Sequence, residues 1–66
     1  MDMLYVLERT HDRKRVEFYS EVRKGKLTYI IREASGASQD SVTTDPEMVK
    51  EFRQHLLRDG YLEASA

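Results

Sequence analysis

Residues 16–32 alternate between apolar and polar side chains around a single glycine, Gly25. The apolar positions on one side of this alternation are Val16, Phe18, Val22, Leu27, Tyr29 and Ile31. A period of two is typical of a β-strand that is buried on one face. Gly25 follows Lys24 and can adopt the positive φ that a two-residue hairpin turn requires. The pattern therefore predicts two antiparallel strands joined by a turn at Lys24 and Gly25.

The predicted turn also sets the register of the hairpin. The expected cross-strand pairs are Arg23–Lys26, Val22–Leu27, Glu21–Thr28, Ser20–Tyr29, Tyr19–Ile30, Phe18–Ile31 and Glu17–Arg32. In this register one face is apolar, and the other is charged apart from Tyr19 and Ile30. A shift of one residue would mix the two faces. The apolar face is therefore predicted to form half of a core.

The segments around the hairpin suggest a small sheet. Residues 3–9, "MLYVLER", have the composition of a strand that is covered on both faces or lies beside a partner chain. Residues 10–14 are polar and predict a loop, and residues 33–41 predict a polar connection. Residues 41–44, "SVTT", are compatible with a short fourth strand.

A helix is predicted within "DPEMVKEFRQHLLRDG", residues 45–60. Asp45 is a favourable N-cap, and Pro46 suits the first helical position because its missing N–H is not needed there. Thr44 with Glu47 offers a capping box as an alternative. Gly60 is a natural end. The apolar stripe at helical spacing is formed by Met48, Val49, Phe52 and Leu56, with Leu57 at its edge.

These segments predict one domain, residues 1–66, of the α+β class. The expected architecture is an antiparallel β-meander of three to four strands with one C-terminal helix packed on one face. Tyr61 and Leu62 are expected to fold back after the helix and close an edge of the core.

The composition excludes several classes of protein. With no cysteine, the chain can form neither a disulfide nor a thiolate metal site. No apolar run approaches the ~18 residues of a membrane span. The first residues, "MDMLYVLERTHD", lack the basic start and cleavage site of a signal peptide. We therefore expect a cytoplasmic protein without a membrane partner.

No group of residues suggests catalysis. His11 falls in a predicted loop and His55 on the outer side of the predicted helix, and neither has neighbours at the spacing of a metal site. Ser35 in "ASGAS" lacks the first glycine of a hydrolase nucleophile elbow, and no Gly-Lys-Ser/Thr follows it. We interpret this segment as a flexible connection. The expectation is a protein without catalytic residues, metal, cofactor or small-molecule substrate.

Charge is distributed unevenly along the chain. The net charge is −1, but residues 1–32 hold eight Lys and Arg against five acids, whereas residues 33–66 hold three against seven. In the predicted register one end of the sheet gathers Arg9, Arg13, Lys14, Arg15 and Arg32. Together with Tyr19 on the outer face, these residues form a candidate nucleic-acid site. Because the whole chain has no excess of positive charge, nucleic-acid binding is the alternative hypothesis rather than the first.

The first strand supports the preferred hypothesis. Its apolar residues are Met3, Leu4, Tyr5, Val6 and Leu7. Such a strand can pair edge to edge with another chain. These five residues are therefore a candidate partner interface, for a protein partner or for a second copy of the chain.

The order of these features resembles the WGR domain, a family found in DNA-dependent poly(ADP-ribose) polymerases and in short bacterial proteins. Phe18-Tyr19 is similar to the family's aromatic pair, Glu51-Phe52 to the acidic-aromatic step of its helix, and Gly60-Tyr61 to its end. The similarity covers roughly residues 4–63.

The Trp-Gly-Arg triplet that gives the family its name is absent. If Gly36 holds the later glycine of that segment, the triplet falls on Arg32, Glu33 and Ala34, and the chain has no Trp. The resemblance thus implies a WGR-like fold and a binding module without catalysis. It does not extend to the family's contacts with DNA ends, which depend on the missing Trp and Arg.

Overall fold

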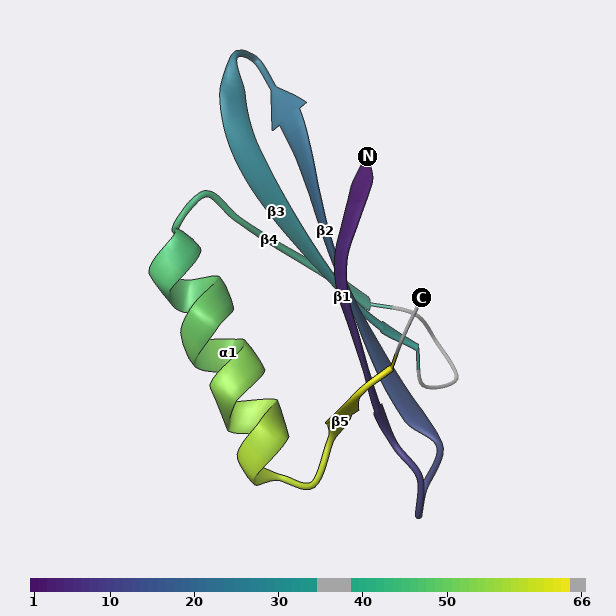
Figure 1. Ribbon diagram of the computed structural model, residues 1–66. Coiled ribbons are helices and arrows are strands. Elements are labelled where there is room, and N and C mark those ends of the chain that lie inside the picture. Colours follow the sequence, from purple (N-terminus) through teal and green to yellow (C-terminus); the bar gives the residue numbers. More distant parts are fainter. Residues whose placement is uncertain (35–38, 65–66) are drawn as a thin grey trace.

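The computed structural model describes residues 1–34 and 39–64, which form one antiparallel sheet and one helix (Figure 1). In chain order the elements are β1 (Asp2–Arg9), β2 (Lys14–Arg23), β3 (Lys26–Ala34), β4 (Gln39–Thr43), α1 (Pro46–Arg58) and β5 (Leu62–Glu63). The strand order across the sheet is β4-β3-β2-β1-β5. The predicted α+β meander with one C-terminal helix is confirmed, with a short fifth strand added at the β1 edge.

The β2–β3 hairpin has the register that the alternation predicted. Each of the seven expected pairs is present, from Arg23–Lys26 at the turn to Glu17–Arg32. Lys24 and Gly25 both have positive φ, 50° and 77°. Two successive positive values match the twist of the flanking strands. β3 runs to Ala34 and β4 begins at Gln39, so the predicted polar connection is shorter than expected. The predicted flexible segment around Ser35, residues 35–38, lies outside the described part of the chain.

β1 pairs with β2 along its whole length, but the register shifts between Met3 and Tyr5. Met3 lies opposite Tyr19 and Tyr5 lies opposite Phe18, so Leu4 is the extra residue of a β-bulge. Because directly opposite residues share a face of the sheet, Tyr5 lies on the same face as Phe18. The bulge thus turns the side chains at the start of β1 relative to the rest of the strand.

α1 begins and ends as the sequence predicted. Asp45 is the N-cap, and its side chain accepts the Glu47 N–H at 3.0 Å, while Pro46 opens the helix. The capping is therefore done by Asp45 and not by the alternative pair of Thr44 and Glu47. At the other end Gly60 has a φ of 92°, which lets the chain turn back toward the sheet.

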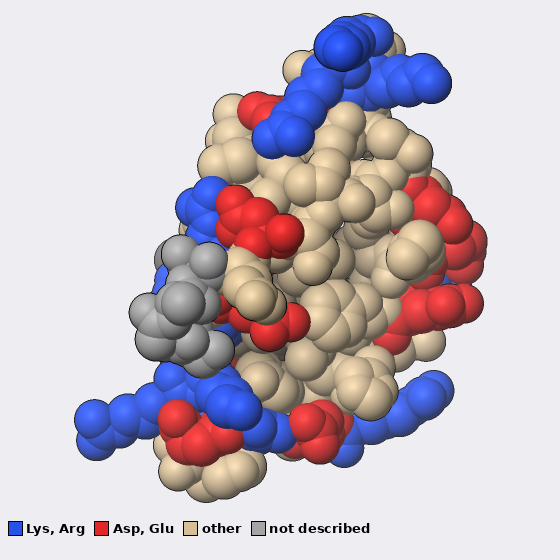
Figure 2. Space-filling view, turned by 180° about the vertical axis from the view of Figure 1, so that it is seen from behind, with Lys and Arg blue, Asp and Glu red and all other residues tan. Residues whose placement is uncertain are grey.

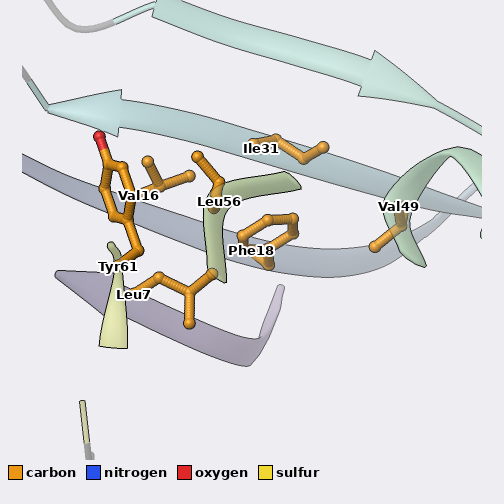
Figure 3. Packing of buried hydrophobic residues seen from close by; sticks show 7 residues of the cluster. All are labelled: Leu7, Val16, Phe18, Ile31, Val49, Leu56 and Tyr61. Carbon is orange, nitrogen blue, oxygen red and sulfur yellow. The ribbon is translucent and has the colours of Figure 1, made fainter. Parts of the chain in front are cut away.

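The core lies between α1 and the helix-facing side of the sheet (Figure 3). Its buried members are Leu7, Val16, Phe18, Ile31, Val49, Leu56 and Tyr61, with Tyr29 and Phe52 packed against them. Phe18 is the central side chain. Its ring centroid lies 5.8 Å from that of Tyr5 and 6.0 Å from that of Phe52.

Three residues assigned to the core by the pattern are exposed. Val22 and Leu27 are 70% and 51% exposed, because β2 and β3 extend beyond the helix that would cover them. Met48 is 56% exposed. Met48 precedes Val49 by one position, about 100° around the helix, and Val49 is the residue that points into the core. The prediction that these three side chains are buried was wrong.

The opposite face of the sheet has a small apolar row of its own. Met3, Tyr19, Ile30 and Val42 lie opposite one another across β1, β2, β3 and β4. Ile30 is only 2% exposed, although no helix covers this face within the described residues. Ile30 is therefore shielded from water by its neighbours on the sheet.

We expect Phe18→Ala to unfold the domain. Phe18 is 1% exposed, and emptying a buried phenylalanine site costs about 3–5 kcal/mol. A core of this size rarely supplies more than about 3–5 kcal/mol in total. Val22→Ala, at an exposed site of the same strand, should change the free energy of unfolding by less than about 0.5 kcal/mol. Chemical denaturation followed by circular dichroism compares the two. A cooperative transition of Phe18→Ala near that of the parent would contradict the assignment of Phe18 as the centre of the core.

Candidate functional site

The first half of β1 is an open edge of the sheet. On one side β1 pairs with β2 throughout. On the other side β5 pairs only with Leu7 and Glu8, and the Ala64 N–H donates to the Val6 carbonyl at 2.8 Å. Among the described residues no strand lies on this side of β1 before Val6 (Figure 1). Within the described part of the chain, the backbone groups of residues 2–5 on this side therefore have no strand partner.

This edge carries apolar side chains beside a hollow. Met3, Leu4 and Tyr5 are 43%, 41% and 40% exposed. The hollow has a volume of about 270 Å³ and is lined by Met3, Leu4, Tyr5, Val6, Glu63 and Ala64. Val6 and Leu7, the other two residues of the predicted interface, are both buried. Leu7 belongs to the core under α1, whereas Val6 lies opposite Glu17 on the other face of the sheet. The exposed part of the predicted interface is thus residues 3–5.

A cation from α1 lies next to this edge. The Arg53 guanidinium sits over the Tyr5 ring, 4.7 Å from its centroid, and one of its terminal nitrogens forms an ion pair with Glu63. The Nε of Arg53 is buried and has no hydrogen-bond partner among the described residues. Helix, edge strand and β5 therefore meet at this guanidinium, which retains an unused donor.

The predicted basic cluster lies at the other end of the sheet, and Arg9 is its most constrained member. The guanidinium of Arg9 donates to both carboxylate oxygens of Asp12, at 2.6 Å from Nη2 and 3.0 Å from Nε. Nη1 donates to the Asp59 carboxylate at 2.7 Å and to the Asp59 carbonyl at 3.2 Å. The guanidinium also lies over the Tyr61 ring, 4.8 Å from its centroid. Arg9 therefore joins the β1–β2 turn to the end of α1.

The pairing changes the acid–base properties of both partners. Hydrogen bonds from Arg9 lower the pKa of Asp12 to about 2, against desolvation that acts in the opposite direction. The same hydrogen bond to Asp12 raises the pKa of Arg9. Both groups are charged over the whole physiological range.

Most of the other basic candidates are also paired within the chain. Arg15 contacts Glu8 at 2.8 Å and Glu17 at 3.1 Å. Lys14 lies 4.0 Å from Asp12. Of the candidate cations, Arg13 alone has no acidic partner within the described residues.

Arg32 and Tyr19 form one unit on the outer face. Arg32 Nε donates to Asp40 at 2.9 Å, a bond that lowers the pKa of Asp40 and raises that of Arg32. Its guanidinium lies over the Tyr19 ring, 5.4 Å from the centroid. The Tyr19 hydroxyl donates to Glu17 at 2.9 Å, and desolvation, followed by this bond, raises the Tyr19 pKa. A guanidinium thus already occupies one side of this ring, where a stacked base would have to lie.

Basic side chains gather at two ends of the molecule rather than in one patch. Figure 2 shows Lys and Arg gathered at the hairpin end and at the β1–β2 end, with uncharged atoms, acidic groups and a smaller basic group on one flank between them. The hairpin end carries Arg23, Lys24 and Lys26, and Arg23 pairs with Glu21. Neither end offers a continuous track for a phosphate backbone.

The described residues do not have the geometry of a metal site. Over residues 1–34 and 39–64, no group of three His, Cys, Asp or Glu residues is placed to hold a metal ion. His11 and His55 are both exposed. The described helix is also too short and too polar to cross a membrane.

Comparisons with known proteins gave no match to a family model, a curated protein or a solved structure. Function therefore has to be inferred from the residues and geometry of this chain.

Sequence reasoning missed the acidic partners of the basic residues and the position of Arg53. For Arg32, the position of Glu17 directly opposite it was predicted. Its partner Asp40 was not, because Asp40 lies on β4, whose register against β3 was not predicted. Arg53 lies outside the apolar stripe predicted for the helix, so nothing in the sequence singled it out. Its position over Tyr5 depends on the angle at which α1 crosses the sheet, which no local pattern specifies.

We expect weak or no binding of nucleic acid by the basic end. Its cations are held by Asp12, Glu8, Glu17 and Asp40, so few remain to displace counterions from phosphate. Fluorescence anisotropy with short duplex and single-stranded oligonucleotides at about 50 mM salt measures this. The Glu8→Gln, Glu17→Gln double variant, which releases Arg15, should bind more tightly than the parent. If the parent binds in a salt-dependent way and the double variant binds no more tightly, the acidic partners are not what limits binding by the basic end.

We expect the Arg9–Asp12 pair to make stability depend on acid pH. Asp12 has a folded-state pKa of about 2, below that of an unfolded aspartate. Its stabilising effect is therefore complete above about pH 4 and is lost as the pH falls toward 2. Thermal melting of the parent and of Asp12→Asn should show a difference at neutral pH that narrows across this interval. A difference that stays constant down to pH 2 would show that the pair does not act through its charge.

Proposed function

We propose that this protein is a small binding module without catalysis that acts through protein contacts, in the first place through self-association along the open half of β1. The observation that carries the proposal is the combination of an unpaired strand edge with three exposed apolar residues, Met3, Leu4 and Tyr5. Exposed apolar edges are usually blocked by charge, proline or a covering element unless they bind something. Addition of a strand would satisfy the backbone groups and cover these side chains at once.

The alternative, nucleic-acid binding through the basic end of the sheet, has less support. Arg9, Arg15 and Arg32 are each engaged by acidic side chains of the same chain. An engaged guanidinium has to give up its carboxylate before it can contact phosphate, which reduces the gain from counterion release.

The resemblance to WGR domains stays a prediction. It is compatible with a hairpin followed by a C-terminal helix, and it implies binding rather than catalysis. At the positions of the triplet, Arg32 is paired with Asp40, whereas Glu33 and Ala34 are exposed near the end of β3. These residues favour a protein-binding relative of the fold over one that contacts DNA ends. A cytoplasmic location likewise stays a prediction from the sequence.

Sedimentation velocity over a range of concentrations tests self-association. The parent should show a species near twice the 7.8 kDa chain mass that grows with concentration. Leu4→Lys places a charge on the edge, and we expect it to shift the equilibrium to the monomer. Met48→Lys, at an exposed apolar position on the helix, is the matched control and should leave the equilibrium unchanged. A parent that is monomeric at every concentration would remove the proposal, and so would equal effects of the two variants.

A further inference from the structure

Building on the self-association proposed above, we infer that the second copy pairs its β1 antiparallel to this β1, and that Asp2 of each copy forms an ion pair with Arg53 of the other. The interface is then a two-fold contact in which each copy contributes one acid and one cation. It joins two five-stranded sheets into one.

The bulge in β1 makes such a pairing geometrically consistent. Asp2 lies opposite Ser20 and Tyr5 lies opposite Phe18, and Ser20 and Phe18 share the face that α1 covers. In a regular strand residues 2 and 5 would lie on different faces. Because Leu4 is an extra residue, Asp2 and Tyr5 both lie on the face of the sheet that α1 covers. Directly opposite residues of antiparallel strands share a face, so Asp2 of one copy can lie opposite Tyr5 of the other.

The charges at this position are complementary. Arg53 lies over the Tyr5 ring and has a buried Nε without an acceptor. Asp2 is exposed, and within residues 1–34 and 39–64 it forms no ion pair. An Asp2 carboxylate placed beside Tyr5 of the other copy reaches the region of this guanidinium. Two-fold symmetry makes the contact occur twice.

The same arrangement also gives the end of β2 a neighbouring strand, β5 of the second copy. β2 runs from Ser20, opposite Asp2, to Arg23 without a partner on the β1 side. In the paired dimer β5 of the second copy continues the line of β1 and lies next to this stretch. Glu63 of that copy then approaches a hairpin end that carries Arg23, Lys24 and Lys26. Val22 of one copy, which is 70% exposed, also lies near Leu62 of the other, which is 65% exposed.

A pair of charge-reversal variants tests the inference. In Asp2→Lys a lysine faces Arg53, and in Arg53→Glu a glutamate faces Asp2. Each variant alone should raise the dimer dissociation constant about tenfold or more, as expected for two lost pairs and two repulsive ones. Mixed in equal amounts, the two should associate with each other within about threefold of the parent, because the mixed dimer again has opposite charges at both contacts. Sedimentation and native mass spectrometry measure both quantities.

Glu51→Lys is the matched control, since Glu51 is exposed on α1 and has no ion pair among the described residues. It should leave the dissociation constant within about twofold of the parent. If the parent is dimeric and Asp2→Lys and Glu51→Lys change its dissociation constant equally, the Asp2–Arg53 pairing is overturned while self-association stands. A monomeric parent would overturn both.

Arg53→Glu also loses its contact with Glu63, so its melting curve is recorded first. If it does not fold, Arg53→Gln replaces it in a double-mutant cycle. Asp2→Lys should then weaken the dimer clearly in the parent and by less than about twofold in the Arg53→Gln background. Equal effects in the two backgrounds would overturn the pairing, as would failure of folded Asp2→Lys and Arg53→Glu chains to associate when mixed.

Discussion

The mismatch in length between one helix and the hairpin beneath it determines most of this structure. α1 has 13 residues and is about 20 Å long, whereas β2 has 10 residues and spans about 33 Å. A single helix therefore covers only part of one face of the sheet. The core gathers where the two overlap, around Phe18, and the hairpin end is left with Val22 and Leu27 exposed. Within residues 1–34 and 39–64 no other element lies over them.

At the opposite end charged contacts are added to the apolar burial of Leu7, Val16 and Tyr61. Arg9 is bound by Asp12 and Asp59 and lies over Tyr61, so one side chain links the first turn to the end of the helix. Gly60 fits this contact: a Cβ built there would lie 3.7 Å from the Arg9 side chain, and the φ of 92° disfavours other residues. Cations that the sequence offers as a phosphate site are thus used to hold the domain together. This explains how the β1–β2 end can gather several Lys and Arg residues and yet leave few of them without an acidic partner.

The sequence predicted the elements whose signals are local. The β2–β3 register followed from alternation and from Gly25, and the limits of α1 followed from Asp45, Pro46 and Gly60. The return of the chain after α1 was expected, and Tyr61 is buried, although Leu62 is 65% exposed. The bulge at Leu4, the register of β5 against β1, and the contact of Arg53 with Tyr5 could not be predicted. They depend on how segments distant in the chain meet, and an apolar run such as "MLYVL" carries no alternation from which to find an irregular position. The candidate edge was thus identified from composition, whereas its charged partner became visible only in three dimensions.

The two edges of the sheet differ in a way that points to β1 as the binding edge. β4 presents Gln39, Asp40 and Ser41, which are polar and exposed, and Asp40 is held by Arg32. β4 has one exposed apolar residue, Val42, and a short, mainly polar strand with a fixed charge is a poor template for another chain. The β1 edge has apolar side chains at residues 3–5 and is covered by β5 only from its middle onward. Asp2 stands at the start of the open stretch, and Arg53, which lies over Tyr5 and is paired with Glu63, stands at its end. An edge with opposite charges at its two ends is complementary to an antiparallel copy of itself, whereas a parallel copy would place like charges together.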